Sequence, residues 1–328
     1  MDKTQLNNTI ETSFHNKKNN IELGTSFAQK RSITAIKEQK EILEGTLNEY
    51  LELFEKNLQK FQVKQIDEDN YKYDELIIER IEAFNTYKNK FLQALLTLGI
   101  YGFSDENTLA IHRFFESSIH YLNQDENHSL IANEWDFDIF NFIIHELFLN
   151  TIAVFLKFEK FEPVSYLLNQ KYYLTQNSTY PKALESFTIF NNHLYSLEHY
   201  NKRLTLNRLS LRGDLLKERS RNSGLDFRYI MQADFICFIN AELNEKDTSY
   251  WGPHTLLFTS DNALEIFARA ESKKYFDKMK CVLNIESVDQ LKSIIKKLKE
   301  KGIRFSSQGM KSFNPTVLTG IEKLASKK

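Results

Sequence analysis

Arginine, glutamate and histidine side chains gather on one predicted helix, over about 104–122. Arg113, Glu116 and His120 project to the same side of such a helix, because seven steps of about 100° bring His120 back beside Arg113. A cation can stabilise negative charge in a reaction, and an imidazole can move a proton. The spacing therefore makes Arg113, His120 and Glu116 candidate catalytic residues.

The arrangement of Arg113, six intervening residues and His120 resembles the motif of HEPN-domain ribonucleases. Those are helical bundles whose dimers place the arginine and the histidine against RNA and cut it without a metal. The resemblance is confined to these two residues, and Phe114 stands where that family usually carries a polar residue. It implies a metal-independent endoribonuclease as the alternative to a non-catalytic protein.

Two other histidines invite a chemical interpretation. His145 and Glu146 begin like the zinc-protease pattern, which needs a second histidine four residues after the first. Position 149 is Leu, so the pattern fails, and we predict no metal site and no cofactor. We interpret His145 as a hydrogen-bonded histidine of the core or its edge. We interpret Trp251 to His254 as a tight turn whose tryptophan packs on the bundle.

Between 202 and 228 the chain mixes leucines with lysines and arginines. Strong binders of single-stranded nucleic acid interleave cations with aromatic residues that stack on bases, and here only Phe227 and Tyr229 are close. We expect the leucines to pack inward and the arginines to pair with the acidic N-terminal half or to bind an anion. The candidate anion-binding or nucleic-acid-binding residues are Arg203, Arg208, Arg212, Lys217, Arg219 and Arg221.

The composition favours a helical, cytoplasmic protein. The chain has 328 residues with only four Pro and ten Gly, so turns are few and helices long. Its two cysteines, Cys237 and Cys281, cannot form a disulfide framework, as expected in a reducing compartment. Residues 1–200 carry 19 Lys and Arg against 29 Asp and Glu, whereas residues 201–328 carry 24 against 15. The absence of a P-loop and of a dinucleotide-binding glycine pattern excludes ATPases and Rossmann enzymes.

The most apolar stretch is Phe137–Phe158, which predicts a central helix. A helix that is apolar on nearly every side is buried in a larger protein or crosses a membrane. An acidic side chain near the centre of a bilayer costs about 2.5–3.5 kcal/mol, and this helix contains Glu146. We therefore expect an interior helix and no membrane span. A thin polar seam follows it, made of Asp138, Asn141, His145, Glu146 and Asn150.

Long amphipathic helices are predicted before the central one. A helix over 26–65 and a second one from Ile77 to Leu98 have apolar residues spaced three and four apart, and their short connection favours antiparallel pairing. Pro181 should begin a later helix, and residues 251–258 are predicted to be extended. The fold class is all-α: an irregular multi-helix bundle around a buried central helix, with a long amphipathic N-terminal helix pair.

Three regions are expected along the chain. Residues 1–25 form a disordered polar tail, residues 26–175 an acidic helical lobe that includes the central helix, and residues 176–328 a basic helical lobe.

Several packing-rich segments, at 141–169, 203–220, 231–243 and 251–278, resemble an uncharacterised helical region of bacterial antiviral-defence proteins. That region is sometimes found downstream of a TIR-type effector domain. The resemblance implies a recognition or scaffold part of an antiphage system that acts through a partner effector. We therefore predict a non-catalytic interaction, scaffold or sensor protein. Its partner, or a second copy, would bind through the N-terminal helices; nucleic acid could bind at 202–228.

Overall fold

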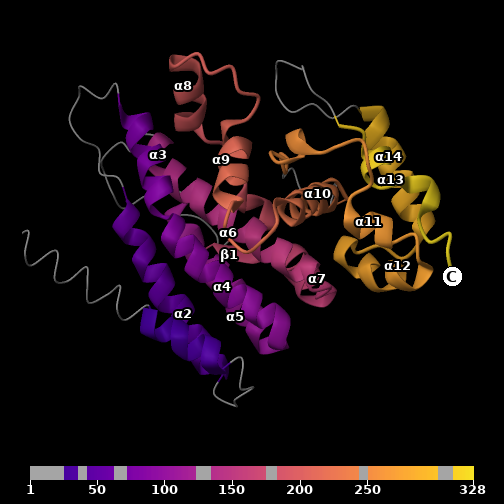
Figure 1. The fold of residues 1–328 in the computed structure, drawn as a ribbon, viewed down its shortest axis with the longest axis horizontal. Helices are drawn as coiled ribbons and strands as arrows, with labels where there is room; N and C mark the ends of the chain where they lie inside the picture. Colours follow the sequence, from indigo (N-terminus) through magenta and orange to yellow (C-terminus); the bar gives the residue numbers. More distant parts are fainter. Residues whose placement is uncertain are drawn as a thin grey trace, which may run out of the picture.

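The computed structural model describes residues 26–35, 43–62, 72–122, 134–174, 183–243, 250–301 and 313–328. The tail predicted over 1–25 lies outside these residues. Helices dominate the described residues, which confirms the all-α fold class (Figure 1). Figure 1 shows α2 and α3 at one end of an elongated molecule and α11 to α14 at the other.

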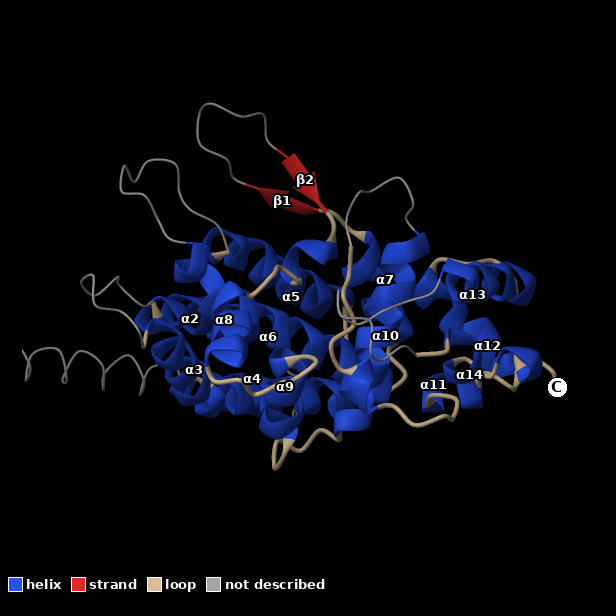
Figure 2. Cartoon of the chain, turned by 90° about the horizontal axis from the view of Figure 1, so that it is seen from above, coloured by secondary structure: helices blue, strands red, loops and turns tan. Residues whose placement is uncertain are grey.

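After a helix over 26–35, the α-helices are α2 Leu43–Leu58, α3 Tyr73–Ala83, α4 Asn85–Tyr101, α5 Asp105–Ser118, α6 Asp138–Lys157, α7 Phe161–Asn169, α8 Tyr195–Arg203, α9 Leu211–Ser220, α10 Phe227–Leu243, α11 Glu265–Arg269, α12 Lys273–Met279, α13 Val288–Lys301 and α14 Pro315–Leu318. Short 3-10 turns, η1 to η7, are Gln59–Phe61, Ile119–Tyr121, Glu134–Phe137, Phe187–Phe190, Leu256–Phe258, Lys280–Leu283 and Ile321–Lys323. Strands β1 Tyr172–Leu174 and β2 Ala183–Glu185 pair antiparallel (Figure 2).

Helix α6 is the centre of the fold, as the sequence predicts. Residues 138–156 are all buried, and α6 packs against α3, α4, α7 and α10. The stretch Trp135–Lys157 is long and apolar enough to cross a membrane, but its apolar window is entirely buried inside the protein. The burial supports the interpretation of this stretch as a core helix.

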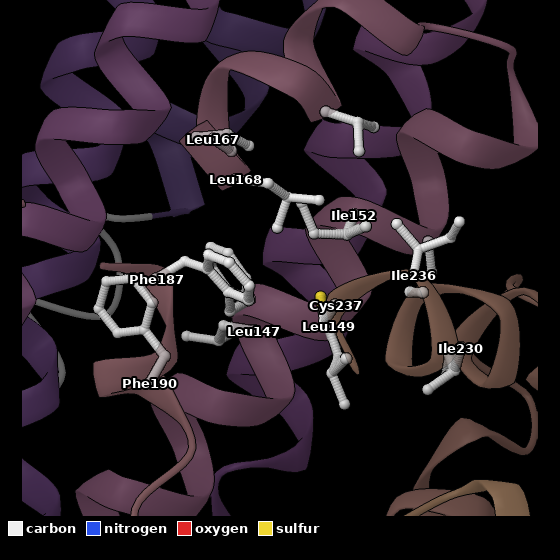
Figure 3. Packing of buried hydrophobic residues seen from close by; sticks show 14 of the residues in the cluster. Leu147, Leu149, Ile152, Leu167, Leu168, Phe187, Phe190, Ile230, Ile236 and Cys237 are labelled. Atoms are coloured by element: carbon white, nitrogen blue, oxygen red, sulfur yellow. The ribbon is translucent and has the colours of Figure 1, made fainter. Parts of the chain in front are cut away.

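The two predicted lobes share one hydrophobic cluster, which extends from Ala28 to Leu324. Figure 3 shows how α6 joins them: its Leu147, Leu149 and Ile152 lie between the side chains of α7 and η4 and those of α10. The boundary predicted at 175 therefore does not separate two independent cores.

The N-terminal helices differ in detail from the expectation. Residues 36–42 and 63–65 of the predicted long helix lie outside the described residues. The second helix is interrupted at Phe84, between α3 and α4. Helix α2 packs most extensively on α5. Its Phe54 joins Phe84, Phe91 and Phe114 in a cluster, at ring-centroid distances of 6.0, 5.1 and 5.9 Å, and so also contacts α4.

Local signals fix several boundaries as expected. The Ser104 hydroxyl caps α5 by accepting a hydrogen bond from the amide of Asn107 at 3.2 Å. Gly102, with φ of 137°, ends α4 in a conformation that favours glycine. The helix expected from Pro181 is wrong for residues 183–190, which form β2 and η4. Its apolar spacing instead serves the pairing with β1 and the packing of Phe187 and Phe190 in the core.

Gly99 allows α4 to approach Phe158 closely, and replacing it tests this contact. A Cβ at Gly99 would lie 2.1 Å from Cδ2 of Phe158. Gly99→Ala should therefore lower the free energy of unfolding by about 1–3 kcal/mol through overpacking, although alanine favours an exposed helix by about 1 kcal/mol. Chemical denaturation measures the change. In a Phe158→Ala background the same substitution should cost less, and an equal cost in both backgrounds would contradict the contact.

Candidate functional site: the α8–α9 arm

Helix α8, the loop over 204–210 and helix α9 form a hairpin of helices that we call the arm, residues 195–220. It contains five of the six predicted anion-binding residues, and Arg221 follows it directly. Figure 1 shows α8 at the outer edge of the molecule and α9 running back toward α6. Few apolar residues of the arm are buried, among them Leu197 and Leu216, so its polar contacts decide how it is held.

The start of α8 is held by the first residue of the central helix. The carboxylate of Asp138 accepts a hydrogen bond from the amide of Ser196 at 2.6 Å, and so caps the amino end of α8. Asp138 is 1% exposed, and this burial raises its pKa to about 6.

The end of α8 is tied to the amino end of α3. Arg203 donates two hydrogen bonds, of 3.0 and 2.9 Å, to the buried carboxylate of Asp74 and a third, of 2.9 Å, to Glu75. His199 adds a contact of 3.1 Å to Asp74, and its ring lies 4.7 Å from that of Trp135. Burial alone would raise the pKa of Asp74, but the hydrogen bonds from Arg203 and His199 lower it.

The end of α9 enters the interior through Arg219, which is 2% exposed. Its guanidinium binds both carboxylate oxygens of Glu146, at 2.9 and 2.7 Å, and donates to the carbonyl of Ile81 at 2.7 Å. The buried ammonium of Lys88 donates to the backbone carbonyl of Arg219 itself. One residue of the arm thus joins α3, α4 and α6.

The start of α9 contributes a second buried polar group, the guanidinium of Arg212. Arg212, which is 5% exposed, donates to the side-chain oxygen of Asn191 at 2.5 Å and to the carbonyl of Asn192. Burial lowers its pKa to about 10, and the nearby carboxylates of Asp138 and Asp234 limit the fall. The hydroxyl of Ser210 caps α9 and contacts Nδ1 of His254 at 3.1 Å.

His145 is fully buried, and the centroid of its ring lies 5.4 Å from that of Trp251 and 6.1 Å from that of His254. Burial lowers the pKa of His145 well below its usual value, so the ring is neutral. Neither ring nitrogen has a hydrogen-bond partner among the described residues. The structure thus confirms a core histidine but corrects the expectation that it is hydrogen-bonded.

The loop between α8 and α9 presents leucines to solvent. Leu204, Leu206 and Leu209 are 39%, 40% and 38% exposed. Thr205 and Asn207 have φ angles of 51° and 52°, and the former is unusual because β-branched residues rarely adopt this conformation. The amides of Thr205 and Leu206 bond the carbonyls of residues 202 and 201, which is the Schellman arrangement at a helix end.

Side-chain hydrogen bonds hold this loop in one conformation. The side-chain amide of Asn201 donates to the carbonyl of Arg208 at 2.8 Å and its oxygen accepts from the amide of Arg208 at 3.0 Å. The Arg208 guanidinium in turn binds both oxygens of Asp214 at 2.7 Å. The three leucines therefore belong to a loop whose conformation is fixed by the backbone bonds at its start and by the contacts of Asn201, Arg208 and Asp214.

The structure does not bring the six predicted cations together on one surface. Arg212 and Arg219 are buried, which corrects their assignment as residues that meet an external anion. Arg203 and Arg219 pair with the N-terminal half, which was one of the two alternatives. The remaining cations have neighbours too: Arg208 binds Asp214, Arg221 binds Glu218 and Lys217 lies over the Phe258 ring.

Arg113 and His120 are both exposed, but His120 belongs to the 3-10 turn η2 beyond the end of α5. Its Nδ1 contacts the carbonyl of Ser117 at 2.5 Å, and its Nε2 lies 3.8 Å from Glu55. The Glu116 carboxylate accepts from the amide of Tyr173 at 2.8 Å. Catalysis by these residues stays a prediction.

Some residues that build the arm were missed in the sequence. Asp74 and Asn191 carry no motif, and their partners lie 129 and 21 residues away in the chain. A usable signal did exist at Ser210, a capping residue just before an apolar and charged helix. The described residues contain no group of three or more His, Cys, Asp or Glu side chains placed to hold a metal ion.

Comparison with protein-family models, with curated proteins and with solved structures finds no match to this chain.

The buried pair of Arg219 and Glu146 can be tested by removing one partner or both. Arg219→Met should lower the free energy of unfolding by about 3–5 kcal/mol, because it leaves Glu146 buried without a partner. The double variant with Glu146→Leu should recover most of that loss. Urea denaturation measures both. Arg221→Met, at an exposed pair, should change stability by less than about 1 kcal/mol. Equal effects of the two arginine substitutions would contradict the buried role of Arg219.

The raised pKa of Asp138 predicts a dependence of stability on pH. The pKa of Asp138 is about 6 in the folded state, against an ordinary value of 3.8, so Asp138 contributes stability at low pH that is lost as pH rises through this interval. Relative to the wild type, Asp138→Asn should gain up to about 3 kcal/mol between these pH values. Denaturation curves across this range measure it. Asp74→Asn, at a carboxyl with a lowered pKa, should show the opposite trend.

Proposed function

We propose that the chain is a non-catalytic interaction protein that binds a partner protein through the loop of the arm. The supporting observation is the group of exposed leucines Leu204, Leu206 and Leu209 on a braced loop. Single exposed leucines are common on protein surfaces and need no explanation. Three exposed leucines within six residues, on a segment that belongs to no helix or strand, concentrate apolar side chains in one loop.

The conformation of the loop is also preorganised, because it is fixed without a partner. A left-handed conformation costs a non-glycine residue about 1–2 kcal/mol, and Thr205 adopts it. Such strain persists only where the surroundings impose it, as Asn201 and the pair of Arg208 and Asp214 do here. A surface already held in one conformation loses less entropy on binding, so more of its contact energy appears as affinity.

The surroundings of the leucines suggest the chemistry of the partner. Lys202, two residues before Leu204, is exposed, whereas the half-exposed guanidinium of Arg208 between the other two leucines is already paired with Asp214. Apolar side chains would supply most of the affinity, and acidic side chains at the edge would favour correct orientation. The partner we propose therefore offers an apolar groove with an acidic rim.

The wider role we propose follows the resemblance to the helical region of bacterial antiviral-defence proteins. In that role the chain is a cytoplasmic scaffold or sensor of an antiphage system, and the partner is the effector. The exposed, braced loop supports the binding part of this proposal, and the resemblance alone supports the biological part. Mass spectrometry of proteins that co-purify with the tagged chain, in its own host, would identify the effector.

The loop is tested by replacing its leucines and asking whether the partner is lost. In the triple variant Leu204→Ser, Leu206→Ser and Leu209→Ser, the co-purified partner should fall at least about tenfold, which corresponds to about 1.4 kcal/mol of binding free energy. The control is Leu184→Ser, at a leucine that is 62% exposed on β2. Retention of the partner by the triple variant, with unchanged thermal stability, would overturn the proposal.

A further inference from the structure

Helices α11 to α14 form a small unit at the end of the molecule away from α2 and α3 (Figures 1 and 2). Residues 251–328 carry 15 Lys and Arg against eight Asp and Glu. Helix α13 turns its apolar side inward, where Leu291, Ile295 and Leu298 are buried. Since that side is already used, α13 offers other molecules mainly its charged sides.

One side of α13 carries a row of lysines. Lys292, Lys296 and Lys299 are spaced four and three residues apart, so they lie along the same side of the helix, next to its buried face. Lys301, on another side, pairs with Glu242 at 2.8 Å. The three lysines of the row form no ion pair within the described part of the chain. Their charges are therefore available to a ligand.

The row borders a groove of about 440 Å³ between α13 and the segments around α11 and α14. Lys296 and Lys299 line it on the α13 side. Aliphatic groups supply much of the remaining surface, from Ala263, Ala268 and Val317, whereas Ile321 is buried. Phe267 also contributes, but it is 1% exposed, so its ring offers no free face.

The opposite side of the groove carries charges of both signs. Asp261, Glu271, Glu322 and Lys323 line it. Glu271 is engaged by Lys323 at 3.9 Å and by a closer contact with Lys327. The groove therefore has one purely cationic wall, on α13, and an opposite wall where two carboxylates have no such partner among the described residues. A ligand that fits this arrangement carries its negative charges on one side only.

We propose that this groove binds a short acidic segment of another protein. In an extended peptide, alternate side chains point to opposite sides. Carboxylates on one side would meet Lys292, Lys296 and Lys299, while apolar side chains on the other would cover the aliphatic surface of the groove. Charge complementarity of this kind sets orientation and specificity.

A single-stranded nucleic acid fits the groove less well. Such a strand is held by base stacking on exposed aromatic rings, and the one ring that lines the groove is buried. The strand also carries a charge at every nucleotide, and Asp261 and Glu322 would repel it. This groove is separate from the leucine loop, so the two sites can be tested independently.

The test uses a fluorescein-labelled peptide in which glutamate and leucine alternate, with fluorescence anisotropy as the measurement. The full chain should bind it, and Lys296→Glu with Lys299→Glu should weaken binding at least about tenfold, because the cationic wall is lost. Ala268→Trp should weaken binding similarly by filling the groove without changing its charge. The matched control is Lys274→Glu with Lys278→Glu, the same charge change on α12 outside the groove.

The outcomes separate the possible explanations. Binding that is lost in both groove variants and retained in the α12 control supports the proposal. Equal loss in the groove and control charge variants would show general electrostatic attraction and overturn it, as would absence of binding by the wild-type chain. Tighter binding of single-stranded RNA, lost in Lys296→Glu with Lys299→Glu, would replace the peptide by a nucleic acid. The triple leucine variant should bind the peptide normally, so failure of the leucine-loop proposal would leave this result unchanged.

Discussion

The ion pair of Arg219 and Glu146 is the constraint on which the arrangement of the helices depends. It lies in the interior, where removing two charges from water costs several kcal/mol per ion, so its net contribution to stability is small even with good geometry. The main effect of the ion pair is to fix the position of α9. A guanidinium that must meet Glu146 on α6 and the carbonyl of Ile81 on α3 allows one placement of α9. Lys88 on α4 adds a further link to the same residue.

Two kinds of interaction therefore hold the molecule together: apolar packing in the core, and hydrogen bonds and ion pairs at the arm. Around α6 the core is a dense apolar cluster, which tolerates no gap and resists opening as a unit. The arm is joined to that core mainly by directional contacts of Asp138, Arg203, Arg212 and Arg219. Segments held by few apolar contacts open at lower free energy than the core around them. An arm of this kind can keep a defined shape while remaining the part of the structure that responds first to a partner or to a change in charge.

The sequence predicts the features that depend on local order and on apolar periodicity. The run from Phe137 to Phe158 is apolar on nearly every side, and Glu146 within it disfavours a membrane span, so the interior position of α6 was predictable. Ser104 and Gly102 act on their own neighbours and were also predictable. The contacts of the arm were not predictable, because the partner of each arginine is determined only in the folded structure. Arg203, for example, binds a carboxylate 129 residues away in the chain. The same apolar spacing serves a helix, a strand or a 3-10 turn, which is why residues 183–190 were misassigned.

The contact between the rings of Trp135 and His199 has an optical consequence. The chain contains two tryptophans, and they lie in different parts of the fold. Trp251 is fully buried and donates its indole N–H to Asp234 at 2.8 Å, whereas Trp135 sits where α8 meets α3. Emission from Trp251 thus reports the integrity of the interior, while emission from Trp135, whose indole lies against the ring of His199, reports the docking of α8. The protein carries its own two-site fluorescent readout, and no external dye is needed to follow the arm separately from the core.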